Sequence, residues 1–324
     1  MVRAARRRIV CQCAVLFYFG LLAASVSGQQ TGGLVIEPVR DNIYLLAGAG
    51  ANVTISVGED GLVLVDAGGT ERSADVIPAV QRLYRDVLSK GAPGGRAALI
   101  RFRLRYILTT SGLPEHAGGI AAVAASQPVV VSHENVLARL SDEGVPTAGL
   151  PTLTYFGSIM KVSQWLNGEG IELIHLPAAI TDGDSVVHFR RADVISTGAI
   201  FDITQYPNID LAKGGSIQGE VAALNRLLDL VIADAGSEGG TLVVPAHGRI
   251  CDVAELSNYR NMITIVRDRV DDMVKKKMTL AQVKSAKPTE DWDARFGRNL
   301  KWTPDMFVEA VYGTLVKGDG RASK

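Results

Sequence analysis

Short apolar segments separated by glycine-rich turns follow one another near the start of the chain, and they constrain its fold more than any other feature. Residues 42–47, 53–57 and 62–66 alternate or run apolar, a pattern typical of β-strands. Apolar residues then recur at helical spacing over residues 71–88, which predicts an amphipathic helix. Strands followed by a one-sided helix indicate a sheet that is covered by helices on one face.

The remainder of the chain repeats this alternation of strands and helices. Further strands are expected at residues 99–108, 129–132, 171–176, 185–189, 194–197 and 241–244. Further helices are expected at residues 115–125, 217–231, 259–273 and 303–316, and residues 142–156 form the longest irregular stretch. Two blocks of strands, each with its own helices, predict an α/β protein of two packed sheets with helices outside.

The N-terminus has the composition of an export signal. Four arginines within residues 3–8 precede a mostly apolar stretch over residues 9–24, and small residues at 25–28 offer a cleavage site before Gln29. The apolar stretch is interrupted by Gln12 and is shorter than the roughly 20 residues of a membrane span, so cleavage is favoured over a retained anchor helix. We therefore expect a signal peptide at residues 1–28 and a mature protein at 29–324 that is exported, periplasmic or secreted, and not attached to a membrane.

Charge and cysteine content exclude several classes of protein. Lysine plus arginine balances aspartate plus glutamate at 34 each, so the chain lacks the excess positive charge of nucleic-acid-binding proteins. Cys11 and Cys13 lie in the expected signal peptide and leave Cys251 alone, which excludes a disulfide framework and a thiolate metal cluster. Cys251 lies in a short loop after a strand and is expected to be a buried, unreactive thiol.

Five motifs follow one another along the chain. They are the strand-rich segment 42–66, the segment 107–119 (ILTTSGLPEHAGG), residues 181–187 (TDGDSVV), residues 197–198 (TG) and residues 244–248 (VPAHG). In this order and at these spacings they resemble the metallo-β-lactamase-fold hydrolases over residues 35–255. The resemblance implies a four-layer αββα sandwich of two mixed β-sheets with helices outside. Residues 29–324 would form one such domain, which ends in a C-terminal helical extension.

The same resemblance assigns metal-ligand positions, and several of them hold residues that do not bind metal. The family's metal loop reads His-x-His-x-Asp-His and is followed by a further histidine, a bridging aspartate and a last histidine. The positions that have lost their ligand are Ser111, Leu113, Ile180 and Ala199. Leucine, isoleucine and alanine side chains have no lone pair to donate, and a serine hydroxyl is a poor zinc ligand. The first of the two metal sites is therefore expected to be absent.

Glu115, His116 and His247 occupy the remaining positions and form a one-metal ligand set. Two histidines and a carboxylate hold catalytic zinc with an open position for water, and the same set holds non-haem iron. The resemblance thus implies one zinc ion at most, with a zinc-bound water as the nucleophile. Glu115 is one methylene longer than aspartate, which displaces the ion by about 1 Å unless the loop adjusts. The alternative is a metal-free cleft, in which Glu115 stabilises a helix start and both histidines hydrogen-bond to backbone.

Other polar residues near these motifs are less strongly indicated as site residues. In the family, Asp66 supports a metal ligand from behind, and its alternative role is hydrogen bonding in a turn. Asp182 and Asp184 flank a glycine in a turn and are the nearest candidates to support or replace ligands. Structural roles are expected for His133, His175 and His188, and solvated surface positions for Tyr206 and Lys213.

Three classes of function agree with this set of residues. The first is an exported metal-dependent hydrolase, reduced to one metal, that attacks the ester, lactone or amide carbonyl of a small molecule. The second is a non-catalytic relative that uses the cleft to bind a small molecule or a partner. The third, which ranks lowest because nothing identifies a thiol or an oxygen-binding site, is a one-iron oxidoreductase. Nothing in the sequence indicates a β-lactam as the substrate.

Overall fold

Strands of the first half of the chain form a seven-stranded mixed sheet in the computed structural model, which describes residues 33–90, 101–233 and 239–318. In spatial order the strands are β1 (Val35–Arg40), β2 (Ile43–Ala47), β3 (Val53–Gly58), β4 (Gly61–Val65), β5 (Leu104–Leu108), β6 (Val129–His133) and β7 (Leu153–Tyr155). Neighbouring strands are antiparallel from β1 to β4 and parallel from β4 to β7.

A second, five-stranded sheet is built from the later strands of the described ranges. Its order is β12 (Leu242–Val244), β11 (Val194–Ser196), β10 (Ser185–Phe189), β9 (Glu169–His175) and β8 (Ile159–Leu166). β11 and β12 are parallel and the other neighbours are antiparallel, so this sheet is mixed as well. Both sheets belong to one compact unit, Leu34–Lys324.

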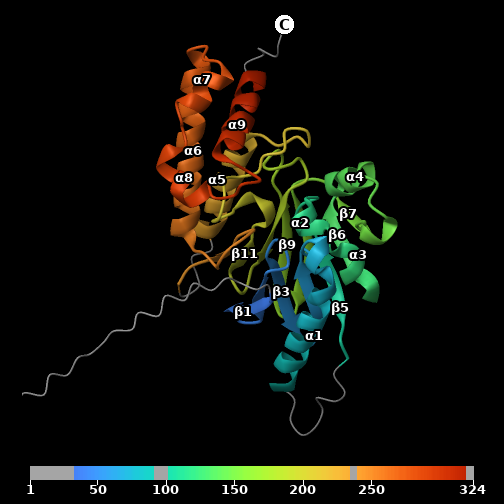
Figure 1. The fold of residues 1–324 in the computed structure, drawn as a ribbon. Helices are drawn as coiled ribbons and strands as arrows, with labels where there is room; N and C mark the ends of the chain where they lie inside the picture. Colours follow the sequence, from blue (N-terminus) through green and yellow to red (C-terminus); the bar gives the residue numbers. More distant parts are fainter. Residues whose placement is uncertain (1–32, 91–100, 234–238, 319–324) are drawn as a thin grey trace, which may run out of the picture. The chain divides into compact units, whose positions relative to one another are not determined.

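The helices cover the outer faces of the two sheets. They are α1 (Ser73–Lys90), α2 (Pro114–Ala117), α3 (Ile120–Val123), α4 (Glu134–Asp142), α5 (Ile217–Ala233), α6 (Val253–Lys275), α7 (Leu280–Ser285), α8 (Glu290–Phe296) and α9 (Pro304–Gly318). Buried side chains of α1, α3 and α4 share a core with the seven-stranded sheet, and those of α5, α6 and α9 share one with the five-stranded sheet. Figure 1 shows α1, α3 and α4 on one side of the strands and the orange and red C-terminal helices on the other.

A third core lies between the sheets and explains why the strands read as continuous apolar runs. On β4, Leu62 and Leu64 face the helices, whereas Val63 and Val65 face the second sheet. A strand covered on both faces needs apolar residues at every position, not at alternate ones. The four layers confirm the predicted fold class of two mixed sheets with helices outside.

Several local expectations differ from the structure. The helix expected at residues 115–125 is broken into α2 and α3. A Cβ on Gly118 would lie 2.5 Å from the Pro114 carbonyl oxygen, and one on Gly119 would lie 2.2 Å from that of Ala67. The backbone N–H of Gly119 donates to the Gly68 carbonyl at 2.8 Å, and the Glu115 carbonyl accepts from Ala51 instead, so the helical hydrogen bond between Gly119 and Glu115 is absent. The stretch expected to be irregular ends in β7, and β1, β8, α4, α7 and α8 were not predicted.

The expectation that Tyr206 lies at the surface is wrong. Its side chain is fully buried, and its hydroxyl donates to the Thr289 carbonyl and lies 2.9 Å from Oδ1 of Asp293. Its ring stacks on Phe307 of α9, because the C-terminal helices cover the loop after β11. Cys251 is buried, as predicted.

The expected signal peptide and the first two residues of the strand expected at 99–108 lie outside the described residues. Within the described ranges, none of the helices combines the length and the apolar character needed to cross a bilayer.

Candidate functional site

A buried carboxylate at the end of β4 organises the first half of the site. Asp66 accepts hydrogen bonds from the backbone N–H of Thr110 at 2.8 Å and from its hydroxyl at 2.7 Å. Its Oδ2 also lies 2.8 Å from Nδ1 of His116. Asp66 has a φ of +65°, a left-handed conformation that turns its carboxylate back over the end of the sheet. A carboxylate bound to Nδ1 fixes the imidazole tautomer and leaves the lone pair on Nε2.

His116 is fully buried, and its Nε2 has no hydrogen-bond partner. Buried polar atoms without a partner are rare, and each one requires an explanation, such as an ion or a water molecule at the site. Burial on its own lowers the pKa of His116, but the hydrogen-bonded Asp66 carboxylate and the nearby Glu115 raise that pKa above its usual value. The environment of His116 therefore favours positive charge beside Nε2, whether a proton or a cation.

The second half of the site comes from the five-stranded sheet. His247 follows β12, and its Nδ1 lies 2.8 Å from Oδ2 of Asp202, in the loop after β11. The other oxygen of Asp202 accepts hydrogen bonds from the backbone N–H and the hydroxyl of Thr204, each at 2.7 Å. Burial lowers the pKa of His247, but Asp202 and then Glu115 raise it above its usual value. Each imidazole thus has its own supporting carboxylate.

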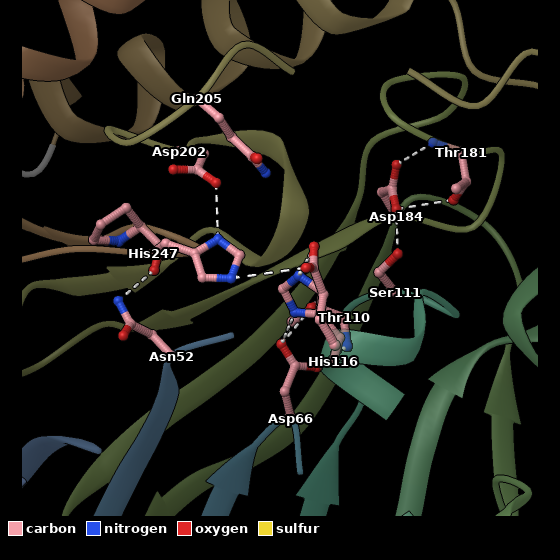
Figure 2. Close-up of polar contacts among 12 residues, drawn as sticks. Asn52, Asp66, Thr110, Ser111, His116, Thr181, Asp184, Asp202, Gln205 and His247 are labelled. Carbon is pink, nitrogen blue, oxygen red and sulfur yellow. Dashed lines mark hydrogen bonds and ion pairs between the residues drawn. The ribbon is translucent and has the colours of Figure 1, made fainter. Parts of the chain in front are cut away.

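Glu115 joins the two halves. Its Oε1 lies 3.9 Å from Nε2 of His116 and its Oε2 lies 3.7 Å from Nε2 of His247. Figure 2 shows His116 with Asp66 and His247 with Asp202. The structure thus brings together the three residues that the sequence selects as ligands, although His247 lies more than 130 residues from the other two. In both imidazoles the nitrogen near Glu115 is Nε2, which is not bound to a supporting carboxylate.

Residues at the four positions that were expected to have lost a ligand have packing contacts or an internal hydrogen bond. Leu113 and Ile180 belong to the core under α5 and α6, and Ala199 packs against the same core. Ser111 is fully buried and its hydroxyl donates to Oδ1 of Asp184 at 2.9 Å. Apolar contacts and one hydroxyl–carboxylate pair therefore fill this half of the site.

The two aspartates near this half have different surroundings. Asp184 is buried and accepts hydrogen bonds from the backbone and hydroxyl of Thr181 as well as from Ser111. Burial raises the pKa of Asp184 to about 6 despite these bonds. The structure places Asp182 in an ion pair with Arg139 of α4, at 2.6 Å. Asp184 thus holds the hydroxyl of Ser111, and Asp182 links the loop between β9 and β10 to α4.

The remaining polar residues have structural contacts. The rings of His133 and His175 stack at 3.6 Å, and Nε2 of His175 lies 2.9 Å from the Asp182 carbonyl. His188 is buried on β10. Lys213 forms an ion pair with Glu143.

Sequence reasoning missed Asp202. It stands three residues after Ala199 and directly after the buried Phe201, and an acidic residue shortly after the motif at residues 197–198 was the available signal.

An open cleft of about 660 Å³ leads to the site. Its lining residues come from the loops after β2, β4 and β5 and from two later segments: Ala49, Gly50, Gly69, Thr70, Glu71, Arg72, Leu113, Pro114, Glu115, Asn208 and Lys301. The cleft is large enough for a small organic molecule. Glu115 lies both at its wall and between the two imidazoles.

The residues that converge on Glu115 do not form a complete metal site. Across the described ranges, no group of three or more His, Cys, Asp or Glu residues is placed to hold a metal ion. The unpartnered Nε2 of His116 and the carboxylate behind each imidazole nevertheless fit a cation. Glu115 would have to exchange its contacts with the two rings for contacts with that ion.

Comparisons with known proteins establish the fold. The sequence matches no family model and no curated protein. Solved structures that resemble this chain include DIM-1 metallo-beta-lactamase, at 15% identity and a TM-score of 0.56, over 72% of this chain and 97% of that one. They also include a metallo-beta-lactamase from Pontibacter korlensis, at 16% identity and a TM-score of 0.56, over 72% and 99%. VMB-1 is similar at 13% identity and a TM-score of 0.56, over 72% and 98%. This chain therefore has the metallo-β-lactamase fold, and at such identities the likeness extends to the fold alone.

Proposed function

We propose that this protein is an exported, one-metal hydrolase in which Glu115, His116 and His247 hold a single zinc ion. The observation that carries the proposal is the fully buried, unpartnered Nε2 of His116, which points with Nε2 of His247 toward one carboxylate. When bound, zinc supplies a Lewis acid that lowers the pKa of a water molecule and polarises a carbonyl. Ester, lactone or amide bonds of small molecules are the substrates that this chemistry and the cleft suit.

The residues around the ligands have distinct tasks in this proposal. Asp66 and Asp202 hold the Nδ1 protons of His116 and His247, which keeps both Nε2 lone pairs available. Thr110 fixes the Asp66 carboxylate with two hydrogen bonds. The core around Leu113 and Ile180 excludes water from the side of the cleft where the first metal site is lost.

A second candidate is a non-catalytic protein that uses the cleft for binding. The carboxylates around His116 and His247 raise both pKa values, so protonated imidazoles can pair with Glu115 without any metal. Protons and zinc compete for the same two nitrogens in this arrangement. Metal content therefore separates the two candidates.

The test is a calorimetric zinc titration of the mature protein without a histidine tag. We expect one zinc ion per chain, and we expect His247→Asn to weaken binding at least about 100-fold because it removes one of three ligands. His175→Asn is the matched control, since His175 stacks on His133 outside the site. Hydrolysis of generic esters and lactones by the same proteins tests the activity. Absence of zinc binding by the parent protein would favour the non-catalytic candidate.

A further inference from the structure

The loop between β2 and β3, residues 48–52, contacts both halves of the candidate metal site. The backbone N–H of Ala51 donates to the carbonyl of Glu115 at 3.1 Å. One residue further on, the backbone N–H of Asn52 donates to the carbonyl of Ala246 at 2.7 Å. A single short segment is thus bonded directly to one candidate ligand and to the residue before another.

The side chain of Asn52 extends this contact across the His247 loop. Its Nδ2 donates to the carbonyls of Pro245 and Gly248, each at 3.0 Å, and Figure 2 shows Asn52 beside His247. The two accepting carbonyls lie on either side of His247 in the chain. Both amide hydrogens are therefore used to hold the backbone that carries this histidine.

The loop also packs closely against the segments that carry Gly69 and Glu115. Gly50 has a φ of +108°, and a Cβ there would lie 2.7 Å from the backbone nitrogen of Gly69 and 3.1 Å from the Glu115 carbonyl oxygen. The backbone N–H of Gly69 in turn donates to the carbonyl of Ala49 at 2.6 Å. Because backbone packs directly on backbone here, a shift of the loop displaces Glu115 as well.

We propose that Asn52 is a positioning residue that sets the separation between His247 and the pair Glu115–His116. This inference rests on the proposed function, because it assigns the loop a role in metal binding. Asp202 orients the His247 ring through Nδ1, whereas Asn52 fixes the place of the backbone beneath it. Asn52 has no contact with the imidazole nitrogens and is not itself a ligand. The side chain is 7% exposed, so water offers little substitute for its two hydrogen bonds.

Asn52→Asp is the most direct test. Aspartate has the same shape as asparagine but offers no donor to the two carbonyls and adds negative charge beside them. Asn42 provides a matched control, since its Nδ2 also donates to two backbone carbonyls, those of Val57 at 3.1 Å and Asn167 at 3.2 Å. Asn42→Asp removes the same kind of contact at the opposite end of β2, away from the site.

Three measurements are made on each variant and on the parent protein. Zinc affinity is measured by calorimetry, the geometry at the metal by the visible absorption spectrum of the cobalt(II) form, and backbone opening at residues 245–248 by hydrogen exchange of the metal-free protein. We expect Asn52→Asp to lose about 10–100-fold in zinc affinity, to change the cobalt spectrum and to exchange faster at these residues. Asn42→Asp should match the parent in all three, even where its unfolding midpoint falls.

The outcomes separate this inference from the proposed function. Parent-like zinc affinity and an unchanged cobalt spectrum in Asn52→Asp would overturn the role of Asn52. If the parent binds no zinc, the proposed function fails, and hydrogen exchange alone decides on Asn52. In that case, faster exchange at residues 245–248 in Asn52→Asp than in Asn42→Asp supports the inference, and equal exchange refutes it. Should the aspartate variant fail to fold, Asn52→Ala removes the same donors without added charge and is judged by the same measurements.

Discussion

The two halves of the site differ in their polar contacts. In the half with Glu115, His116 and His247, each imidazole has a supporting carboxylate, and its second nitrogen lies 3.9 Å (His116) or 3.7 Å (His247) from a Glu115 oxygen. In the half with Ser111 and Ile180, both side chains are buried, and Asp184 accepts hydrogen bonds from hydroxyl and backbone donors. Leu113 and Ile180 belong to the core, whereas His116, although also buried, has a ring nitrogen without a hydrogen-bond partner.

This difference shows what packing alone requires of a cleft. Apolar residues and a satisfied hydroxyl–carboxylate pair are sufficient to fill the lost half. Nothing in packing requires two imidazoles with carboxylates on one nitrogen and open lone pairs on the other. A fully buried nitrogen without a hydrogen-bond partner lowers stability, and this observation supports the proposed ion at Nε2 of His116.

Restoring the lost ligands should produce the largest effect. We expect the combination of Ser111→His, Leu113→His, Ile180→His, Ala199→Asp and Glu115→Asp to bind two zinc ions, against at most one in the parent. The metal-free variant should be less stable by about 2–4 kcal/mol, because polar groups replace packed Leu113 and Ile180. Zinc should recover much of this loss, since only the folded chain binds it tightly. Urea unfolding with and without zinc, together with calorimetric stoichiometry, checks both parts. A parent protein that already binds two ions would show that the two halves are misassigned.

Replacing a supporting carboxylate should have a smaller effect that is confined to the retained half. Thr204 donates twice to Oδ1 of Asp202, so in Asp202→Asn the amide oxygen stays with Thr204 and the NH2 group lies opposite Nδ1 of His247. An amide donor at Nδ1 favours the tautomer with its proton on Nε2. We expect a 10- to 100-fold loss of zinc affinity, or about 1.4–2.7 kcal/mol. Asp184→Asn, in the lost half, should leave zinc affinity within about twofold of the parent value. Equal losses of zinc affinity in both variants would contradict the proposed difference between the two halves of the site.

The smallest expected effect is a pH dependence that arises in the lost half. Burial raises the pKa of Asp184 to about 6, so the folded protein binds this proton more tightly than the unfolded chain does. The contribution of Asp184 to stability is therefore most favourable below about pH 4 and declines as the pH rises to about 6. We expect the stability of the parent relative to Asp184→Asn to fall by about 1–2 kcal/mol over this interval. Urea titrations of both proteins at pH 4, 5, 6 and 7 measure the difference, and a constant difference would show that Asp184 does not titrate there.

The fold was predictable because strands covered on both faces leave strong apolar runs. β3, β4 and β10 are almost wholly buried and were expected within one residue of their bounds. β8 was not expected, because it lies at the edge of its sheet and mixes polar with apolar residues. α4 was missed because Val136 and Leu140 are its only buried side chains, too few to mark a helical face.

The candidate ligands were predictable for another reason, since motif order alone placed Glu115, His116 and His247. Asn52 and Asp202 were not, because their partners lie 193 and 45 residues away and neither residue carries a motif of its own. Tyr206 was misjudged since only the packed C-terminal helices bury it. Local patterns thus identify residues that perform chemistry, whereas the residues that hold them in place become visible through contacts distant in sequence.

The division of the ligands between the sheets also bears on how the protein unfolds. Asp66, Glu115 and His116 follow strands of one sheet, whereas Asp202 and His247 follow strands of the other. An ion held by both groups links the two sheets at one edge and must be released before they separate. Zinc is therefore expected to lengthen the lifetime of the native state mainly by slowing unfolding, since neither sheet alone carries the full ligand set when it first forms. For a protein that is exported as proposed, this kinetic lifetime matters more than the equilibrium free energy.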